Sequence, residues 1–213
     1  MREAPAEAAT VLDWGVATAA LPGEAESGDL HLVRPAAGGA LVAVVDGLGH
    51  GSEAATAARL AVAALASHAQ ESPLSLFEHC HRALKGTRGV VMSLASFRRG
   101  DASLTWLGVG NVEGVLLRAV AGADVARARS SLVTRGGIVG SELPRLQPEV
   151  LPLAAGDTLI FATDGIREGF VEGLPTDATP QQQADHILAR HRKGTDDALV
   201  LIARYRGPGR TGR

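Results

Sequence analysis

Residues 40–52 read Ala-Leu-Val-Ala-Val-Val-Asp-Gly-Leu-Gly-His-Gly-Ser, a continuous apolar run that ends at an aspartate, Asp46. An apolar run of this length, rich in valine and bounded by turn residues, predicts a fully buried strand over Ala40–Val45. A carboxylate at the end of a buried strand costs free energy unless it is paired or bound to a cation. This stretch therefore predicts a central strand and a charged side chain that needs a partner.

Four other aspartates lie in a similar context. Asp164 ends a second apolar run, Asp196 and Asp197 immediately precede the last one, and Asp29 stands at the start of an early segment. Each Asp-Gly alone is more typical of a turn than of a ligand. Carboxylates that a sheet brings together repel one another, however, and a divalent cation removes that repulsion. Ligation by oxygen atoms alone favours hard ions such as Mg²⁺ or Mn²⁺.

The remaining chain alternates short strands with three helices. Uninterrupted Ala-rich sequence predicts a helix over Ser52–Gln70. Ser72-Pro73 opens a second helix that ends near Lys85, and a third covers Gln181–His191. Further strands are predicted over Val11–Leu21, Leu30–Val33, Val90–Phe97, Ser103–Val109, Val112–Val120, Thr158–Thr163 and Ala198–Tyr205. This order indicates an α+β layered sandwich.

The connections between the middle strands are too short for a parallel crossover. We therefore predict an antiparallel meander of three strands, Val90–Phe97, Ser103–Val109 and Val112–Val120. A stretch punctuated by Gly and Pro follows, from Gly136 to Pro152. We expect one domain over residues 1–206 and a disordered Gly/Arg-rich tail over residues 207–213.

Composition excludes several classes of function. The formal net charge of -2 gives nucleic acid no electrostatic attraction, and an aromatic content of 3% provides few platforms for stacking bases. No apolar run reaches the roughly 18 residues of a membrane helix, and the N-terminal residues lack a secretory signal pattern. The single cysteine, Cys80, excludes an internal disulfide and lies within a predicted helix, where a buried structural role is expected. We expect a cytoplasmic protein with neither nucleic-acid nor membrane partners.

The loop after Asp46 follows a strand and opens a helix, as nucleotide-binding loops do. The third glycine of a G-x-G-x-x-G motif is replaced here by Ser52, and no Gly-Lys-Ser/Thr sequence is present. A dinucleotide or nucleoside triphosphate site is therefore disfavoured.

Three stretches together resemble the PPM family of metal-dependent protein phosphatases, and more narrowly its bacterial SpoIIE/RsbX branch. They are Val-Val-Asp-Gly-Leu-Gly-His-Gly at residues 44–51, Phe-Ala-Thr-Asp-Gly-Ile-Arg-Glu at 161–168 and Thr-Asp-Asp-Ala-Leu-Val-Leu-Ile at 195–202. The fragments at 86–89 and 108–112 are similar to the RsbX type of stress-response feedback phosphatase. The motifs occur in the family's order and cover about Asp29 to Tyr205.

The resemblance implies an αββα sandwich with a centre of two Mn²⁺ or Mg²⁺ ions between the sheets. By motif, Asp46 would bridge the two ions and the carbonyl of Gly47 would ligate one of them. Asp164 and Asp196 would hold the other ion. Asp29 matches an early acidic position of the family, and Asp197 would support Asp196 or replace it as the ligand.

The resemblance also implies an activity and a partner. The chain would release phosphate from serine or threonine by metal-activated water, acting on a phosphorylated STAS-domain or anti-sigma regulatory protein of bacterial stress signalling. Two alternatives stay open: a non-catalytic domain that binds phosphoproteins, and a hydrolase of small phosphate esters.

Histidines provide one catalytic candidate. Many eukaryotic family members carry histidine directly after the metal-binding Asp-Gly, whereas this chain has Leu48 there and its nearest histidine is His50. His50 is a candidate general acid because imidazole titrates in the right range, although a helix-capping role and a metal-bound water are alternatives. His79 and His81, at positions i and i+2 of a helix, point to different faces and are not expected to share an ion.

Overall fold

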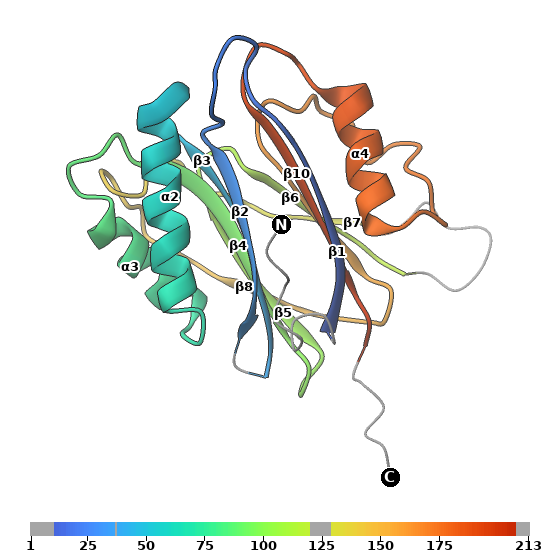
Figure 1. The fold of residues 1–213 in the computed structure, drawn as a ribbon. Helices are drawn as coiled ribbons and strands as arrows, with labels where there is room; N and C mark the ends of the chain where they lie inside the picture. The colour runs from blue at the N-terminus through green and yellow to red at the C-terminus, as the bar shows by residue number, and fades with distance from the viewer. Residues whose placement is uncertain (1–10, 37, 120–128, 208–213) are drawn as a thin grey trace.

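Two five-stranded antiparallel sheets pack face to face in this computed structural model, which describes residues 11–36, 38–119 and 129–207 (Figure 1). The β10 sheet contains, in spatial order, β1 (Leu12–Ala19), β10 (Ala198–Tyr205), β9 (Thr158–Ala162), β6 (Glu113–Leu117) and β7 (Arg129–Ser131). The β3 sheet contains β2 (Asp29–Ala36), β3 (Gly39–Gly47), β4 (Val90–Arg98), β5 (Ser103–Val109) and β8 (Glu149–Pro152).

Helices cover the outer face of each sheet. The helices α2 (Gly51–Ser67) and α3 (Pro73–Ala83) lie against the β3 sheet, and α4 (Pro180–His191) lies against the β10 sheet (Figure 1). The predicted α+β sandwich of αββα type is confirmed, and the three predicted helices are present with ends shifted by a few residues. Within the described part of the chain, no helix has both the length and the apolarity that crossing a membrane requires.

The strand β3 explains why residues 40–45 are continuously apolar. Val42 and Val44 face the other sheet and join the central layer of the core, which includes Trp106 and Phe161. Leu41, Ala43 and Val45 face the opposite way, toward α2 and α3. Because both faces of β3 are covered, alternation of apolar and polar residues is absent.

The predicted role of Cys80 is confirmed. Its side chain is fully buried between α3 and the β3 sheet, and burial raises the pKa of the thiol to about 12. A thiol in this state is a packing group and a poor nucleophile.

The predicted meander is wrong in its third strand. The strands β4 and β5 pair as expected, but β6 belongs to the β10 sheet, between β9 and β7. At Gly110 the backbone takes a φ of +93°, and its N–H donates to the carbonyl of Arg135 instead of closing a hairpin with β5. Gly110-Asn111 therefore carries the chain from one sheet to the other, which a short connection alone does not reveal.

Two strands were not predicted. The edge strand β8 pairs with β5 and lies in the Gly/Pro-punctuated stretch, and β7 pairs with β6. Val120, the last residue of the predicted strand Val112–Val120, lies outside the described residues. So do residues 208–213 of the predicted tail.

Candidate metal centre

The sheet registers bring the predicted aspartates to one end of the sandwich. Asp29 and Asp46 are direct cross-strand partners at the end of the β2–β3 pair. Asp164 follows β9, while Asp196 and Asp197 precede β10, and these two strands are antiparallel neighbours in the other sheet. Each sheet therefore contributes carboxylates to the same end.

Three of these side chains line one cleft of about 340 Å³, namely those of Asp46, Asp164 and Asp196. The other described lining residues are Leu48, Gly49, His50, Val91, Gly110, Asn111, Gly136 and Thr195. None of these lining residues is Lys or Arg. The described lining is thus strongly negative, and the nearby Lys193, which lies outside it, offsets only part of the charge on Asp164.

The electrostatics of the cleft show how costly this arrangement is. Burial first, and then the charges of Asp29, Asp164, Asp196 and Asp197, raise the pKa of Asp46 from 3.8 to about 9. Burial also raises the pKa of Asp29 to about 7, although the hydrogen bond from Thr163 opposes the shift. The pKa of Asp164 is raised as well, again by burial first and then by Asp196. Ionised carboxylates here need a cation.

A hydrogen bond from a residue of the neighbouring sheet holds the side chain of Asp29 in place. Its Oδ2 accepts a hydrogen bond from the hydroxyl of Thr163 at 2.7 Å, and Thr163 Oγ1 in turn accepts the N–H of Leu199 at 2.9 Å. Asp29 is 3% exposed and is absent from the cleft lining, so it stands behind Asp46. Thr163 was not identified from the sequence, although its place beside Asp164 was the available signal.

Asp196 and Asp197 occupy different environments. Both oxygens of Asp197 are engaged, Oδ1 by the N–H of Leu21 and Oδ2 by the N–H of Gly28, each at 2.7 Å. The Asp197 side chain is buried, whereas Asp196 is half-buried and lines the cleft. Asp196 Oδ1 also accepts the N–H of Asp197 at 2.8 Å. Asp197 thus fixes the loop that leads into β2, and Asp196 faces the cleft.

The glycines after two of the aspartates are required by close packing. A Cβ on Gly47 would lie 2.2 Å from the carbonyl oxygen of Ala54 in α2, and one on Gly165 would lie 1.9 Å from the carbonyl oxygen of Asp197. The Gly47 N–H donates to the carbonyl of Gly28 at 3.1 Å. These contacts bring the β3 end, α2 and the β10 entrance together around the cleft.

Asn111 is a polar residue of the site whose role was not predicted. Its Nδ2 donates to Asp164 Oδ2 at 2.7 Å from the segment that crosses between the sheets. The hydrogen bond orients the Asp164 carboxylate and leaves its other oxygen available. Asn111 belongs to the fragment 108–112 that carried part of the family resemblance, which was the available signal.

His50 lies at the rim of the cleft. It occupies the N-cap position of α2, but its side chain makes no capping hydrogen bond. Instead, Nδ1 lies 2.7 Å from Glu24 Oε1, and the imidazole is 58% exposed. The ring is thus oriented by a carboxylate through one nitrogen, and it makes no hydrogen bond with the described cleft aspartates.

The donor set fits hard divalent cations. Carboxylate and carbonyl oxygens are the ligands that Mg²⁺ and Mn²⁺ prefer. No three of these aspartates, all within the described ranges, bring their carboxylate oxygens within 4.8 Å of one another. The oxygens are therefore spread along the cleft rather than gathered around a single point.

Solved structures share this fold at high similarity. A structure from work on "The bacterial stressosome: a modular system that has been adapted to control secondary messenger signaling" has 32% identity and a TM-score of 0.81, covering 91% of this chain and 99% of the other. RsbX in complex with magnesium has 19% identity and a TM-score of 0.80, covering 92% and 96%. A structure of the PP2C phosphatase domain and a fragment of the regulatory domain of SpoIIE from Bacillus subtilis has 24% identity and a TM-score of 0.70, covering 91% of this chain and 63% of that longer chain.

No match was found among curated protein sequences. Residues 36–206 match the sequence profile described as Stage II sporulation protein E (SpoIIE), a stretch that includes β3, β9, β10 and the cleft between them. The predicted membership of the PPM family, in its SpoIIE/RsbX-like branch, is therefore confirmed, and the chain belongs to the SpoIIE family.

Proposed function

We propose that this chain is a phosphatase that uses Mn²⁺ or Mg²⁺ to release phosphate from serine or threonine of a bacterial regulatory phosphoprotein. The observation that carries the proposal is the cleft lined by Asp46, Asp164 and Asp196, whose described lining has no Lys or Arg. A phosphate dianion would be repelled by this cleft unless cations were bound there. Metal ions would therefore be part of substrate binding as well as of the reaction.

The site residues divide by position. Asp46, the carbonyl of Gly47, Asp164 and Asp196 are the proposed metal ligands. Asp29, behind Asp46, contributes negative charge and is the further ligand candidate. Asp197 is proposed as a support, because both of its oxygens already accept backbone hydrogen bonds.

A pair of divalent ions supplies, when bound, an activated water and positive charge for the phosphoryl oxygens. The chain's own residues do the rest. Asn111 orients Asp164 through the 2.7 Å hydrogen bond, and Asp197 fixes the loop before β2. His50, oriented by Glu24, is proposed to donate a proton to the departing seryl or threonyl oxygen.

The proposed substrate is a phosphorylated STAS-domain or anti-sigma regulatory protein in the cytoplasm. Support comes from the similarity to RsbX and to the protein of the stressosome work, the second at 32% identity over 91% of this chain. The cleft is open at the surface, which suits a phosphorylated side chain on a folded partner.

The test measures phosphate release from a phosphorylated STAS-domain protein, with and without Mn²⁺. Wild type, Asp46→Asn and His50→Gln are compared, and Asp185→Asn on the exposed side of α4 serves as a matched control. We expect release that requires Mn²⁺, is lost in Asp46→Asn and is unchanged in Asp185→Asn. His50→Gln should slow phosphate release. It should also remove the fall in rate that deprotonation of the general acid causes as pH rises.

Two results would favour the alternatives. Binding of Mn²⁺ and of the phosphoprotein without any release would identify a non-catalytic binding domain. Faster turnover of free phosphoserine or nucleotides than of phosphoproteins would identify a hydrolase of small phosphate esters.

A further inference from the structure

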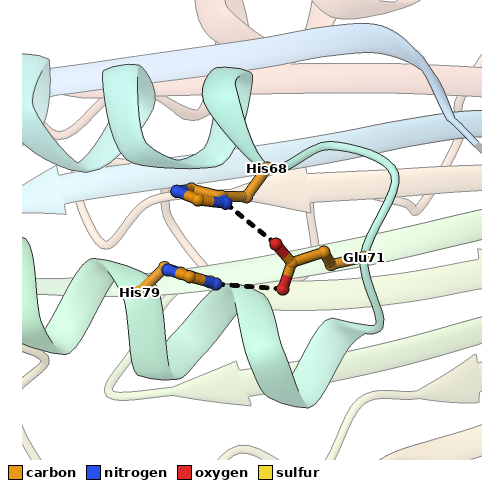
Figure 2. Close-up of side chains that lie close together, drawn as sticks. All are labelled: His68, Glu71 and His79. Carbon is orange, nitrogen blue, oxygen red and sulfur yellow. Dashed lines mark hydrogen bonds and ion pairs between the residues drawn. The ribbon is translucent and has the colours of Figure 1, made fainter.

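Three side chains far from the aspartate cleft converge where α2 ends and α3 begins: His68, Glu71 and His79 (Figure 2). His68 Nδ1 lies 2.8 Å from Glu71 Oε1, and His79 Nε2 lies 2.9 Å from Glu71 Oε2. The two imidazoles stack with ring centroids 3.6 Å apart and planes 10° apart. All three donor groups lie within 4.8 Å of one another. Two nitrogens and a carboxylate thus face a common point.

The backbone fixes the positions of these residues. His68 is the C-cap of α2, and its N–H donates to the carbonyl of Ala64 at 3.2 Å. The N–H of Glu71 donates to the carbonyl of His68 at 2.9 Å, and the next residue, Ser72, caps α3. His79 lies further along α3, which packs beside α2 over a shared buried core. The cluster therefore stands on two rigid helices and the tight turn between them.

The cluster is separate from the cleft and open to water. Its side chains are partly exposed: His68 37%, Glu71 41% and His79 24%. The helix α2 has 17 residues, so at 1.5 Å per residue its two ends are about 25 Å apart. The cleft lies at the N-terminal end of α2 and the cluster at its C-terminal end.

The donors differ in kind from those of the cleft. Two imidazoles and one carboxylate form a ligand set that zinc uses with a fourth position left to water, whereas Mg²⁺ and Mn²⁺ prefer oxygen. Zinc bonds of 2.0–2.1 Å to nitrogen place neighbouring ligand atoms about 3.3 Å apart. The present spacing, at most 4.8 Å, reaches that value by small rotations of exposed side chains. We propose that His68, Glu71 and His79 form a zinc site, independent of the cleft.

Arg82 regulates access to this site. Its Nη2 lies 2.9 Å from His79 Nδ1, and because a guanidinium only donates hydrogen bonds, Nδ1 accepts and Nε2 carries the ring proton. Zinc binding to Nε2 of the neutral ring requires the ring proton to be on Nδ1 instead, and Nδ1–H then requires Arg82 to turn away. Arg82 is exposed to solvent. The hydrogen bond from Arg82 thus competes with zinc for His79, and Arg82 weakens zinc binding without being a ligand.

The test is a calorimetric titration of the full chain with Zn²⁺ in excess Mg²⁺. Zinc can also enter the aspartate cleft, and that binding should be the same in wild type and in every variant of the cluster. We expect His79→Gln and Glu71→Gln to weaken this binding at least about 10-fold and Arg82→Gln to tighten it by about 10-fold, the scale of outer-sphere effects. His186→Gln, a histidine on α4, is the matched control and should change nothing.

A second readout reports on the histidines directly. Zinc should shift the imidazole NMR signals of His68 and His79 together and leave that of His186 in place. Zinc affinity unchanged in both His79→Gln and Glu71→Gln would overturn the proposal. The proposal would also be overturned if the substitutions lowered the melting temperature equally with and without zinc. That result would identify the three side chains as a stabilising hydrogen-bonded cluster that binds no ion.

Discussion

Asp196 and Asp197 should respond in opposite ways to the same substitution. Asp197 is buried, and its two oxygens accept the N–H groups of Leu21 and Gly28 at 2.7 Å each. Asp196 is half-buried and faces the cleft, and its one hydrogen bond among the described residues is from the N–H of Asp197. Changing each to asparagine preserves shape and tests the two environments separately.

The expected magnitude follows from the hydrogen bonds. Asparagine has one oxygen, so Asp197→Asn leaves one buried N–H facing an NH₂ group, and the other bond loses its charge. A hydrogen bond to a charged group contributes about 1.5–3 kcal/mol, so the free energy of unfolding should fall by about 2–4 kcal/mol. For a chain of this size the melting temperature falls by roughly 5–15 °C. Asp196→Asn keeps its bond through the amide oxygen and should change stability by less than about 0.5 kcal/mol.

The assay is urea unfolding of both variants in a metal chelator, followed by calorimetric titration with Mn²⁺. Asp196→Asn should lose most Mn²⁺ affinity while it remains as stable as wild type without metal. Asp197→Asn should be unstable without metal but retain Mn²⁺ binding at low temperature. If Asp197→Asn is as stable as wild type and abolishes Mn²⁺ binding, while Asp196→Asn binds normally, the assignment of support and ligand is reversed and the reasoning is refuted.

Three further predictions concern the same end of the sandwich. Because the folded pKa values of Asp46 and Asp29, about 9 and about 7, exceed the usual 3.8, the folded state holds more protons than the unfolded state between those limits. Without metal the free energy of unfolding should therefore fall as pH rises from 4 toward 9, and urea unfolding that shows it constant or rising would contradict the shifts. Asn111→Ala removes the hydrogen bond that orients a cleft aspartate and should weaken Mn²⁺ binding about 10–100-fold in calorimetry, with little change in melting temperature. Gly47→Ala places a Cβ 2.2 Å from a carbonyl of α2 and should lower the free energy of unfolding by at least about 1–3 kcal/mol, whereas Gly100→Ala, with open space around it, should not.

Local sequence was sufficient for the three helices, for the strands other than β7 and β8, and for the positions of the acidic residues. The run over residues 40–45 is apolar because both faces of β3 are covered, so burial could be read directly from composition. Asp46, Asp164 and Asp196 were identifiable because a charge at the end of such a run is anomalous. Convergence of these residues in one cleft needed the long-range pairing of β9 with β10 and the packing of the two sheets against each other, whereas β2 and β3 form a local hairpin.

The features that the sequence did not reveal depend on contacts between distant segments. Asp197 differs from Asp196 only through its bonds to backbone N–H groups about 170 residues away. Nothing in Gly110-Asn111 distinguishes a hairpin from a crossing between sheets, because both use a short turn with glycine. His79 was correctly separated from His81, which instead accepts the N–H of Gly140 at 3.0 Å. The approach of His79 to Glu71 depends on how α3 packs against α2.

The packing of the two sheets explains why the cleft carboxylates are poised for cations. Their spacing is set by the central core, in which Phe97, Trp106, Phe161 and Tyr205 are fully buried, so Asp46 and Asp164 cannot move apart to relieve their repulsion. The raised pKa values describe how protonation relieves the repulsion between these aspartates. Binding of a cation would relieve the same repulsion and would compete with protonation. The residues that would hold the ions come from the ends of both sheets. It follows that Mn²⁺ should stabilise the fold more strongly at pH 8 than at pH 6, because fewer protons have to leave.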